Sequence, residues 1–543
     1  MSPASRVADC HSRLLSPTLR NIICLSHLAI ATMESKTLGD VLDNVKRIVN
    51  STSSAAQDNS VVLPKDIPAL HPGASSLPDG PLPLGLAIER LTANVLPYLN
   101  AASLSARYYG FVTGGVTPAA LIADMLTSIY DQNVQVHLPA ETIATEVEVA
   151  ALNMLVELFQ LPKQEWAVGT AGSGGATFTT GATASNVLGL ALGREFVLSE
   201  AAKRATGKLM SVGEHGLLAV AQAAQVDQVK VLSTLPHSSI AKAASIVGLG
   251  RSSVASIVKE GTELAIDVDT LRSLAEDAEA QRVAYVLAVS AGEVNTGHFA
   301  SSSADMMRQV REICNEYGIW IHVDGAFGLF GRILTGHKQS QDYQHITDGT
   351  RGLELADSIT ADGHKLLNVP YDCGLFFTRH KALSVDACQN GNAAYLSSGV
   401  GGSLIQSPCN IGLENSRRFR ALPVYATLTA YGRGGYCEML IRQIGLARRL
   451  AAWIFDHEGY ELLPARLGKD EALAKTFIIV LFRAKEDAVN EKLVQRIKES
   501  GKVYVSGTSW DGKAATRIAI SNWRVDPDAD IKVVQGVLED VLR

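Results

Sequence analysis

Residues 356–374 read ADSITADGHKLLNVPYDCG, and this stretch decides the fold of the chain. An apolar run with strand character ends in Asp362 and is followed by Gly363, His364 and Lys365. A polar group after a buried parallel strand lies at the edge where open α/β sheets bind ligands. Burial disfavours the charged form of an amine, and imine formation requires the neutral amine. A His-Lys pair usually lies on a solvated surface, but this position makes Lys365 a candidate nucleophile.

Segments with strand character lie on both sides of this stretch and alternate with helical patterns. The expected strands are VKVLS (229–233), VAYVLAVS (283–290), IWIHVD (319–324), DSITA (357–361) and GLFFT (374–378), with helical segments such as residues 303–317 between them. Such alternation predicts an α/β fold with a mainly parallel sheet and helices on both faces. After Arg420, a long helix-prone stretch, further strands and a terminal helix predict a second, smaller α+β domain.

Length and composition are those of an ordinary globular protein. A chain of 543 residues is expected to form more than one domain. A charged fraction of 19% and a net charge of -6 give no electrostatic reason to bind nucleic acid or acidic lipid. The seven scattered cysteines form no CxxC pair, so they suggest neither disulfides nor a zinc site, and a cytoplasmic location fits best. The most apolar early stretch, residues 22–31, is too short to span a membrane.

The first 83 residues are expected to be an N-terminal extension and linker. Residues 1–32 carry three arginines and one acid, which weakly resembles a targeting segment, whereas MESKTLGDVLDNVKRIV from Met33 has a typical amphipathic start. We interpret residues 1–32 as an untranslated, removed or disordered extension in preference to an organelle address. Residues 51–85 are rich in Ser, Pro, Gly and Asp, so a linker is expected before the folded body begins near Leu84.

A turn of small and hydroxyl-bearing residues introduces one predicted helix. Residues 171–195 read AGSGGATFTTGATASNVLGLALGRE, which places residues 181–186 at the helix entry. Free backbone N–H groups and small side chains there can bind an anion such as phosphate. A tight strand-to-helix turn capped by Thr and Ser explains the same residues equally well. Because the turn lacks both a P-loop lysine and GxGxxG spacing, a nucleotide-dependent α/β enzyme is a remote alternative.

Two further polar residues follow predicted strands. Asp324 ends the strand IWIHVD, where a carboxylate can pair with a protonated ring nitrogen of a cofactor. A helix cap, or a metal ligand paired with His322, is the alternative for this acid. His237 follows VKVLS, so its imidazole can cover a cofactor ring and contact a substrate carboxylate. For an isolated residue of this kind, a capping histidine is the more common explanation.

Together these motifs resemble those of the group II pyridoxal 5'-phosphate (PLP) dependent decarboxylases, which include the aromatic amino acid, glutamate, histidine and tyrosine decarboxylases. The resemblance covers residues 84–543 and rests on RYYGFVTGGVTPAALIADML (107–126), HVDGAFG (322–328) and DGHKLLNVPYDCG (362–374). It implies a PLP fold-type I (aspartate aminotransferase-like) large domain, a role in amino acid metabolism, and a homodimer with the active site between subunits. The expected parts are 84–145, packing on the dimer, 146–424, binding PLP, and 425–543, the small domain.

The resemblance also implies a role for each site residue. Lys365 resembles the Schiff-base lysine, Asp324 the partner of the pyridine nitrogen, and His237 the histidine stacked on the ring. Ala326 resembles the small residue under the ring, and no metal is expected. The remaining positions are Ala182, Thr183 and Ala184 at the phosphate, with Asp362 and His364 nearby, and Phe111, Thr113 and Gly114 in the substrate pocket.

Two departures from the family pattern leave the product open. Gly292-Glu293-Val294 stands where many decarboxylases have Gly-Thr-Thr, so an acid replaces a threonine that contacts the cofactor. Pro408 falls where aromatic decarboxylases have a protonating tyrosine, and Tyr395 is the only tyrosine between residues 380 and 420. Tyr395 is the expected proton donor, with His237 or Lys365 as alternatives. The predicted reaction converts an L-amino acid into its amine and CO2; aldehyde synthesis, aldol-type cleavage at Cα and non-catalytic PLP binding are the alternatives.

Overall fold

The computed structural model describes residues 39–40, 42–43, 45–47, 62–64, 67–70, 76–338, 340–390 and 405–543. Contacts divide the chain into two units, Met1–Ser60 and Val61–Arg543. The described residues of the first unit are helical. Residues 1–32, which resemble a targeting segment, lie outside the described residues.

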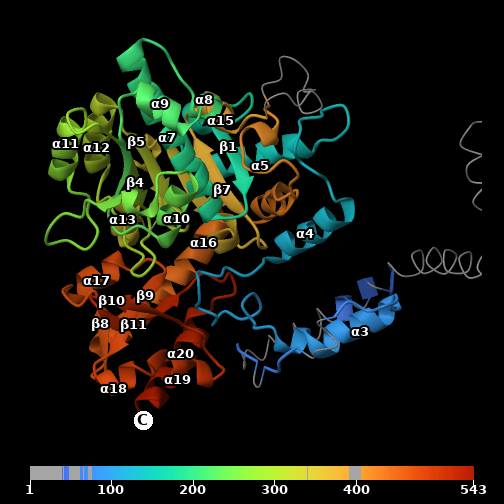
Figure 1. The fold of residues 1–543 in the computed structure, drawn as a ribbon. Coiled ribbons are helices and arrows are strands. Elements are labelled where there is room, and N and C mark those ends of the chain that lie inside the picture. The colour runs from blue at the N-terminus through green and yellow to red at the C-terminus, as the bar shows by residue number, and fades with distance from the viewer. Residues whose placement is uncertain are drawn as a thin grey trace, which may run out of the picture. The chain divides into compact units, whose positions relative to one another are not determined.

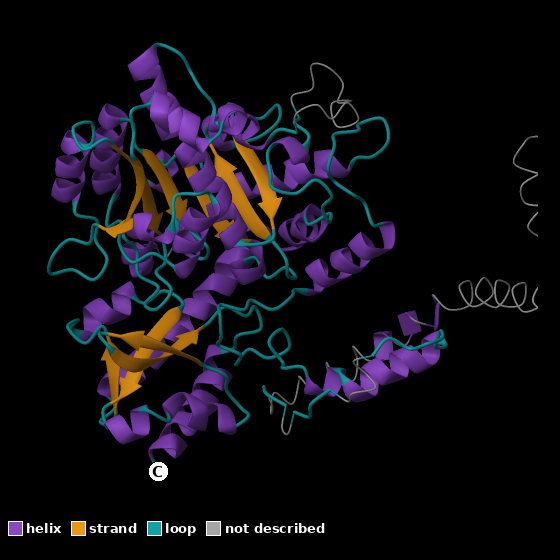
Figure 2. Cartoon of the chain, viewed as in Figure 1, coloured by secondary structure: helices purple, strands orange, loops and turns teal. Residues whose placement is uncertain are grey.

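A seven-stranded sheet forms the centre of the large domain (Figures 1 and 2). Its strands are β1 (Gly175–Thr179), β2 (Gln228–Ser233), β3 (Val254–Ser256), β4 (Val283–Ser290), β5 (Trp320–Asp324), β6 (Ser358–Asp362) and β7 (Gly374–Thr378). They lie in the order β1-β7-β6-β5-β4-β2-β3. The strands β3, β2, β4, β5 and β6 are parallel, whereas β7 is antiparallel to both of its neighbours. The prediction of a mainly parallel sheet is confirmed, as are the five expected strands.

The sheet carries a hydrophobic core on each face. Along β4, Val286 and Ala288 belong to one core, whereas Leu287 and Val289 belong to the other. Successive side chains of a strand point to opposite faces, so a strand covered on both sides is apolar at nearly every position. This explains why the central strands are recognisable as continuous apolar runs. The short β3 and the Gly- and Thr-containing β1 carry no such signal and were not expected.

The described chain up to residue 388 also forms α-helices, of which those after β1 connect the strands of the sheet (Figure 2). They are α3 (Leu84–Asn94), α4 (Pro118–Tyr130), α5 (Ala144–Leu158), α6 (Lys163–Trp166), α7 (Ala182–Thr206), α8 (Val212–His215), α9 (Leu217–Ala223), α10 (Ser238–Ile246), α11 (Val268–Asp277), α12 (Ala304–Tyr317), α13 (Gln344–Thr350), α14 (Gly363–Leu366) and α15 (Lys381–Cys388). The 3-10 helices are η2 (Leu96–Tyr98), η3 (Arg251–Ser253), η4 (Gly328–Leu334), η5 (Ser340–Tyr343), η6 (Leu353–Leu355) and η7 (Pro408–Asn410). Of the helices that the structure describes, none combines the length and apolarity required to cross a bilayer.

A four-stranded antiparallel sheet forms the smaller C-terminal domain. Its strands are β8 (Tyr460–Leu463), β9 (Ile479–Ala484), β10 (Ser506–Trp510) and β11 (Lys513–Ala519), in the order β10-β11-β9-β8. Its helices are α17 (Lys469–Lys475), α18 (Asp487–Asn490), α19 (Leu493–Glu499) and α20 (Pro527–Leu542). Val480, Phe482 and Ile518 are part of a separate core. The predicted smaller α+β domain is confirmed.

One long helix belongs to both domains. Helix α16 (Ala421–Asp456) runs between the two sheets in Figure 1 and contains one residue with non-helical backbone, Gly432. Its apolar residues up to Ile444 lie in the core of the large domain, whereas those from Leu446 onward lie in the core of the small domain. The domain boundary expected between residues 424 and 425 therefore falls in the first turn of α16.

Candidate active site

A cavity of about 470 Å³ lies at the carboxyl ends of the parallel strands. Three strands end at its wall, β4 with Ser290, β5 with Asp324 and β6 with Asp362. The position is the one that open α/β sheets offer to ligands. The expected site residues that line it are Phe111, Ala182, Thr183, Ala184, His237, Asp324, Ala326, Asp362, His364 and Lys365. Residues far apart in the sequence thus meet in one place.

The N-terminus of α7 forms one end of the cavity. Gly181 precedes the helix and has no side chain to cap it, and no Thr or Ser side chain accepts from its first N–H groups in the described chain. The Ala182 N–H donates to Asp362 Oδ1 over 2.6 Å. The N–H groups of Thr183 and Ala184 have no hydrogen-bond acceptor within the described parts of the chain. Free amides at a helix N-terminus favour an anion, so this end of the cavity fits a phosphate group.

Lys365 lies on the single-turn helix α14, directly after β6. Its Nζ is 2.8 Å from Asp362 Oδ2 and 5.7 Å from the centre of the Phe327 ring, and its side chain is 18% exposed. His364 Nε2 lies 3.5 Å from Asp362 Oδ1. Burial lowers the pKa of His364, although Asp362 opposes the shift. The lysine amine is therefore held inside the cavity and remains accessible from it.

Two residues expected in the substrate pocket are placed elsewhere. A Cβ atom on Gly114 would lie 1.8 Å from the backbone oxygen of Lys365, so only glycine permits this approach. The Gly114 carbonyl also accepts a hydrogen bond from Asn368 Nδ2 over 2.6 Å. The Thr113 hydroxyl donates to the Gly110 carbonyl. Neither residue lines the cavity, and Gly114 instead supports the loop that carries the lysine.

Asp324 presents its carboxylate to the cavity and is 9% exposed. Its Oδ2 accepts from Asn186 Nδ2 over 2.8 Å, and its Oδ1 accepts from the Ala326 N–H over 3.3 Å. Each oxygen keeps accepting capacity, which suits a protonated ring nitrogen. Burial lowers the pKa of His322 to about 4, with Asp324 opposing the shift. Among the described residues, no group of three or more His, Cys, Asp or Glu side chains is placed to hold a metal ion.

His237 has two functions in the structure. It precedes α10, and its side chain accepts a hydrogen bond from the Ser239 N–H, as a capping residue does. The same side chain lines the cavity. Desolvation lowers the pKa of His237, and the nearby cations of Lys365 and Arg517 reinforce the shift while Asp324 opposes it.

Arg517 is a site residue that the sequence reasoning missed. It lies on β11 of the small domain and lines the cavity, although its side chain is largely buried. Its Nε has no hydrogen-bond partner, and it forms no ion pair with any described residue. Desolvation lowers the pKa of Arg517, with Glu293 opposing. The sequence marks RIAIS only as a strand, so nothing there indicates that this cation reaches the site of another domain.

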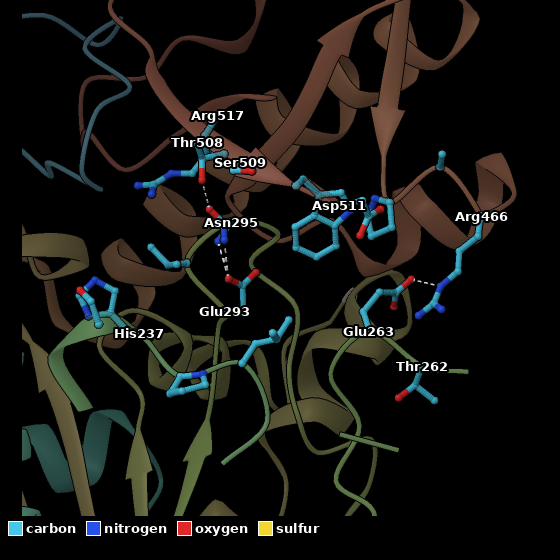
Figure 3. Close-up of a pocket in the computed structure, with 17 residues that line it drawn as sticks. His237, Thr262, Glu263, Glu293, Asn295, Arg466, Thr508, Ser509, Asp511 and Arg517 are labelled. Carbon is cyan, nitrogen blue, oxygen red and sulfur yellow. Dashed lines mark hydrogen bonds and ion pairs between the residues drawn. The ribbon is translucent and has the colours of Figure 1, made fainter. Parts of the chain in front are cut away.

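A second cavity, of about 890 Å³, adjoins the first and shares His237, Glu293 and Arg517 with it (Figure 3). The Glu293 carboxylate accepts four hydrogen bonds from Asn295 and Thr296, two from backbone and two from side-chain groups. Glu293 is therefore bound to its own turn. Asn295 Oδ1 in turn accepts from the Thr508 hydroxyl of β10 over 2.8 Å, which joins this turn to the small domain.

Two residues bear on the expected proton donor, Pro408 at the position of the family tyrosine and Tyr395. Pro408 begins η7, is buried and does not line the cavity. Tyr395 falls within residues 391–404, which lie outside the described residues. A second missed residue, Tyr371, lines the cavity, with its ring centre 4.3 Å from that of His364. Tyr371 follows Lys365 by six residues in the sequence, but only the fold shows that its side chain lines the same cavity.

A model of the pyridoxal-dependent decarboxylase conserved domain matches residues 75–476. The chain belongs to this family. Its cofactor is PLP, and its activity class is that of the PLP-dependent carboxy-lyases. The cavity fits this cofactor, because it combines free helix amides for the phosphate, a carboxylate for the ring nitrogen and an amine for the aldehyde.

Relatives with different named activities are similar to this family member over most of its length. The L-2,4-diaminobutyrate decarboxylase of Acinetobacter baumannii is 29% identical over 72% of this chain and 71% of its own. The phenylacetaldehyde synthase of Arabidopsis thaliana is 24% identical over 82% of this chain and 83% of its own. The crystal structure of Oryza sativa TDC with PLP and tryptamine has a TM-score of 0.75 at 21% identity and covers 92% of this chain and 97% of its own. This structural similarity shows a shared fold.

Proposed function

We propose that this enzyme converts an L-amino acid into the corresponding amine and CO2, with PLP bound covalently through Lys365. The observation that carries the proposal is the meeting of Lys365, Asp324 and the free amides of α7 in one cavity. When bound, PLP supplies an electron sink that weakens the bonds at the substrate Cα.

Different residues lining the cavity would contact different parts of the cofactor. The N–H groups of Thr183 and Ala184 would bind the phosphate, with His364 beside the start of the same helix. Asp324 would accept the hydrogen of the ring nitrogen and keep that nitrogen protonated, because an opposite charge favours the protonated form. The small side chain of Ala326 would leave room for the ring, and His237 would contact it.

The substrate is held by residues from both domains. Arg517 has no ion-pair partner in the described chain, so a substrate carboxylate entering the cavity supplies the missing anion. Phe111 and Tyr371 also line the cavity and are 63% and 61% exposed, which places apolar ring surface where a side chain can contact it.

Protonation of Cα needs a positioned acid, and we propose Tyr395 for this step. General acids typically contribute a factor of about 100 to 10,000. Tyr395→Phe should therefore slow amine formation by at least about tenfold and increase any aldehyde by-product. An unchanged rate together with an unchanged amine-to-aldehyde ratio would leave His237 or Lys365 as the donor.

Aldehyde synthesis is the second candidate function. It is favoured by Pro408, which cannot act as an acid at the position of the family tyrosine, and by the similarity to a phenylacetaldehyde synthase. The two functions differ in their products, since decarboxylation gives an amine and CO2, whereas the oxidative reaction consumes O2 and water and gives an aldehyde, CO2, ammonia and hydrogen peroxide.

We also propose a cytoplasmic homodimer. Helix α4 exposes the apolar residues Leu121, Ile122, Met125, Leu126 and Ile129. A contiguous exposed apolar surface of this kind marks an interaction site. A second copy of the chain is the proposed partner, which agrees with the expected role of residues 84–145. The cysteines Cys314, Cys373, Cys388, Cys409 and Cys437 are free, as in a reducing compartment.

The decisive experiment combines product analysis with chemical trapping. Purified enzyme is incubated with a panel of L-amino acids, and CO2, amine, aldehyde and ammonia are measured. Borohydride reduction followed by peptide mapping should place PLP on Lys365, and Lys365→Ala should lose turnover entirely while the Lys338→Ala control keeps it. A label on Lys338 or Lys381 instead would contradict the assignment.

A further inference from the structure

A chain of buried polar side chains lies directly behind the cavity wall. Its members are Asn186, Ser239, His322 and Ser358, whose exposures range from 0% to 4%. Ser358 Oγ lies 2.8 Å from His322 Nδ1, and His322 Nε2 lies 2.9 Å from Asn186 Oδ1. Since buried polar groups without partners are costly, each hydrogen in such a chain must have an acceptor.

The chain branches at Asn186 and reaches two residues of the cavity. Asn186 Nδ2 lies 2.8 Å from Asp324 Oδ2 and 3.0 Å from Ser239 Oγ. Ser239 Oγ in turn lies 2.7 Å from His237 Nδ1. A single amide on α7 thus contacts the carboxylate at the end of β5 directly and the imidazole before α10 through one hydroxyl.

The donors and acceptors of Asn186 fix the direction of the first branch. An asparagine amide has two N–H hydrogens and one oxygen. Both hydrogens are used by Asp324 and Ser239, so the oxygen accepts from His322 Nε2–H. His322 Nδ1 then accepts from the Ser358 hydroxyl. Trp320 closes the far end, because its indole N–H donates to Ser358 Oγ over 3.1 Å.

The second branch fixes the tautomer of His237. Because Ser239 Oγ accepts from Asn186, its own hydrogen is directed to His237 Nδ1. The Ser239 N–H donates to the same nitrogen over 3.2 Å. A ring nitrogen that accepts two hydrogen bonds carries no hydrogen, so the hydrogen of the neutral ring is on Nε2. His237 can therefore donate a hydrogen bond into the cavity while it is uncharged.

We infer that Asn186 is a positioning residue that holds Asp324 as a hydrogen-bond acceptor toward the cofactor ring and, through Ser239, holds His237 as the neutral Nε2–H tautomer. The inference rests on the proposed roles of Asp324 and His237. It adds that both roles depend on one amide that touches neither cofactor nor substrate. The charged groups that face His237 are Asp324, Asp362, Lys365 and Arg517, with Glu293 in the adjoining wall.

The branch to His237 is tested by Ser239→Ala, with Ser238→Ala as the matched control on the same helix turn. Full-length, PLP-loaded protein with labelled histidine rings is titrated by NMR, and the His237 signal is identified by its absence in His237→Asn. Loss of one donor to Nδ1 should raise the titration midpoint of His237 by about half a pH unit or more, since hydrogen bonds to the neutral form oppose the charged form. An unchanged midpoint in Ser239→Ala overturns the inference, as does an equal shift in Ser238→Ala.

The branch to Asp324 is tested by Asn186→Leu, which keeps the number and branching of the side-chain heavy atoms and removes all three hydrogen bonds. The dissociation constant of PLP should rise at least about tenfold, one hydrogen bond to a charged group being worth about that factor. Ser238→Ala should leave it within about twofold, because Ser238 takes no part in the hydrogen bonds of Asn186. Unchanged PLP affinity in a folded Asn186→Leu protein overturns the inference. If this variant does not fold, the Ser239→Ala titration decides alone. Neither measurement uses turnover, so a failure to release CO2 would refute the proposed function while both remain readable.

Discussion

At the scale of single residues, Asp324 is the acid on which the proposed chemistry depends most. Asp324→Asn preserves the shape of the side chain but removes the charge that keeps the ring nitrogen protonated. A desolvated charge pair that loses one partner costs on the order of 3 to 5 kcal/mol, so turnover should fall at least several hundredfold. Circular dichroism should show an unchanged fold. Turnover within about tenfold of the parent enzyme would mean that Asp324 only caps or packs.

Arg517 should affect activity and stability in opposite directions. Arg517→Met removes the cation offered to the substrate carboxylate, so KM should rise at least about tenfold. It also removes a buried guanidinium whose Nε lacks a partner, so the melting temperature should stay equal or increase. The exposed Arg251→Met serves as the control for both measurements. A lower melting temperature with unchanged KM would assign Arg517 a structural role.

At the scale of elements, the N-terminus of α7 is where cofactor binding and helix stability can be separated. Ala184→Asp places an acid in the first helical turn, which stabilises a helix by about 0.3 to 1 kcal/mol. The same carboxylate competes with the phosphate for the free amides. PLP affinity measured by fluorescence should therefore fall at least about tenfold while the cofactor-free protein melts no earlier. Ala184→Asn, of equal size and neutral, should retain most of the affinity.

The elements also show what the sequence could and could not predict. Strands β4 to β7 were predictable because both of their faces are buried, and Asp324 and Asp362 were predictable because parallel strands end at one edge. Arg517 reaches the cavity from another domain, and Asn186, the last residue of the stretch 181–186 expected to bind phosphate, instead contacts Asp324. Both depend on tertiary packing between segments distant in the chain, which no local pattern records. The sequence suggested that Glu293 contacts the cofactor, but it gave no sign of the four hydrogen bonds that the Glu293 carboxylate accepts from its own turn.

At the scale of the whole molecule, the exposed face of α4 predicts the assembly. Ile122→Glu introduces a charge into an apolar surface that the proposed partner copy covers, so the dimer should dissociate and turnover should fall with it. Light scattering and activity measured on the same samples check this. Leu218→Glu, at an isolated exposed residue of α9, should change neither. A dimer that persists with full activity would move the proposed contact away from α4.

Helix α16 has a consequence for how the molecule comes apart. Apolar residues on one half of the helix lie in one core and those on the other half lie in the second, so melting either core withdraws support from the helix that the other core needs. The second unit should therefore lose its structure in one calorimetric transition, with a calorimetric enthalpy equal to the van't Hoff enthalpy. Leu446→Gly places two glycines in succession at positions 445 and 446 of α16. The pair would destabilise the helix between the two cores, so the single heat-absorption peak should split into two.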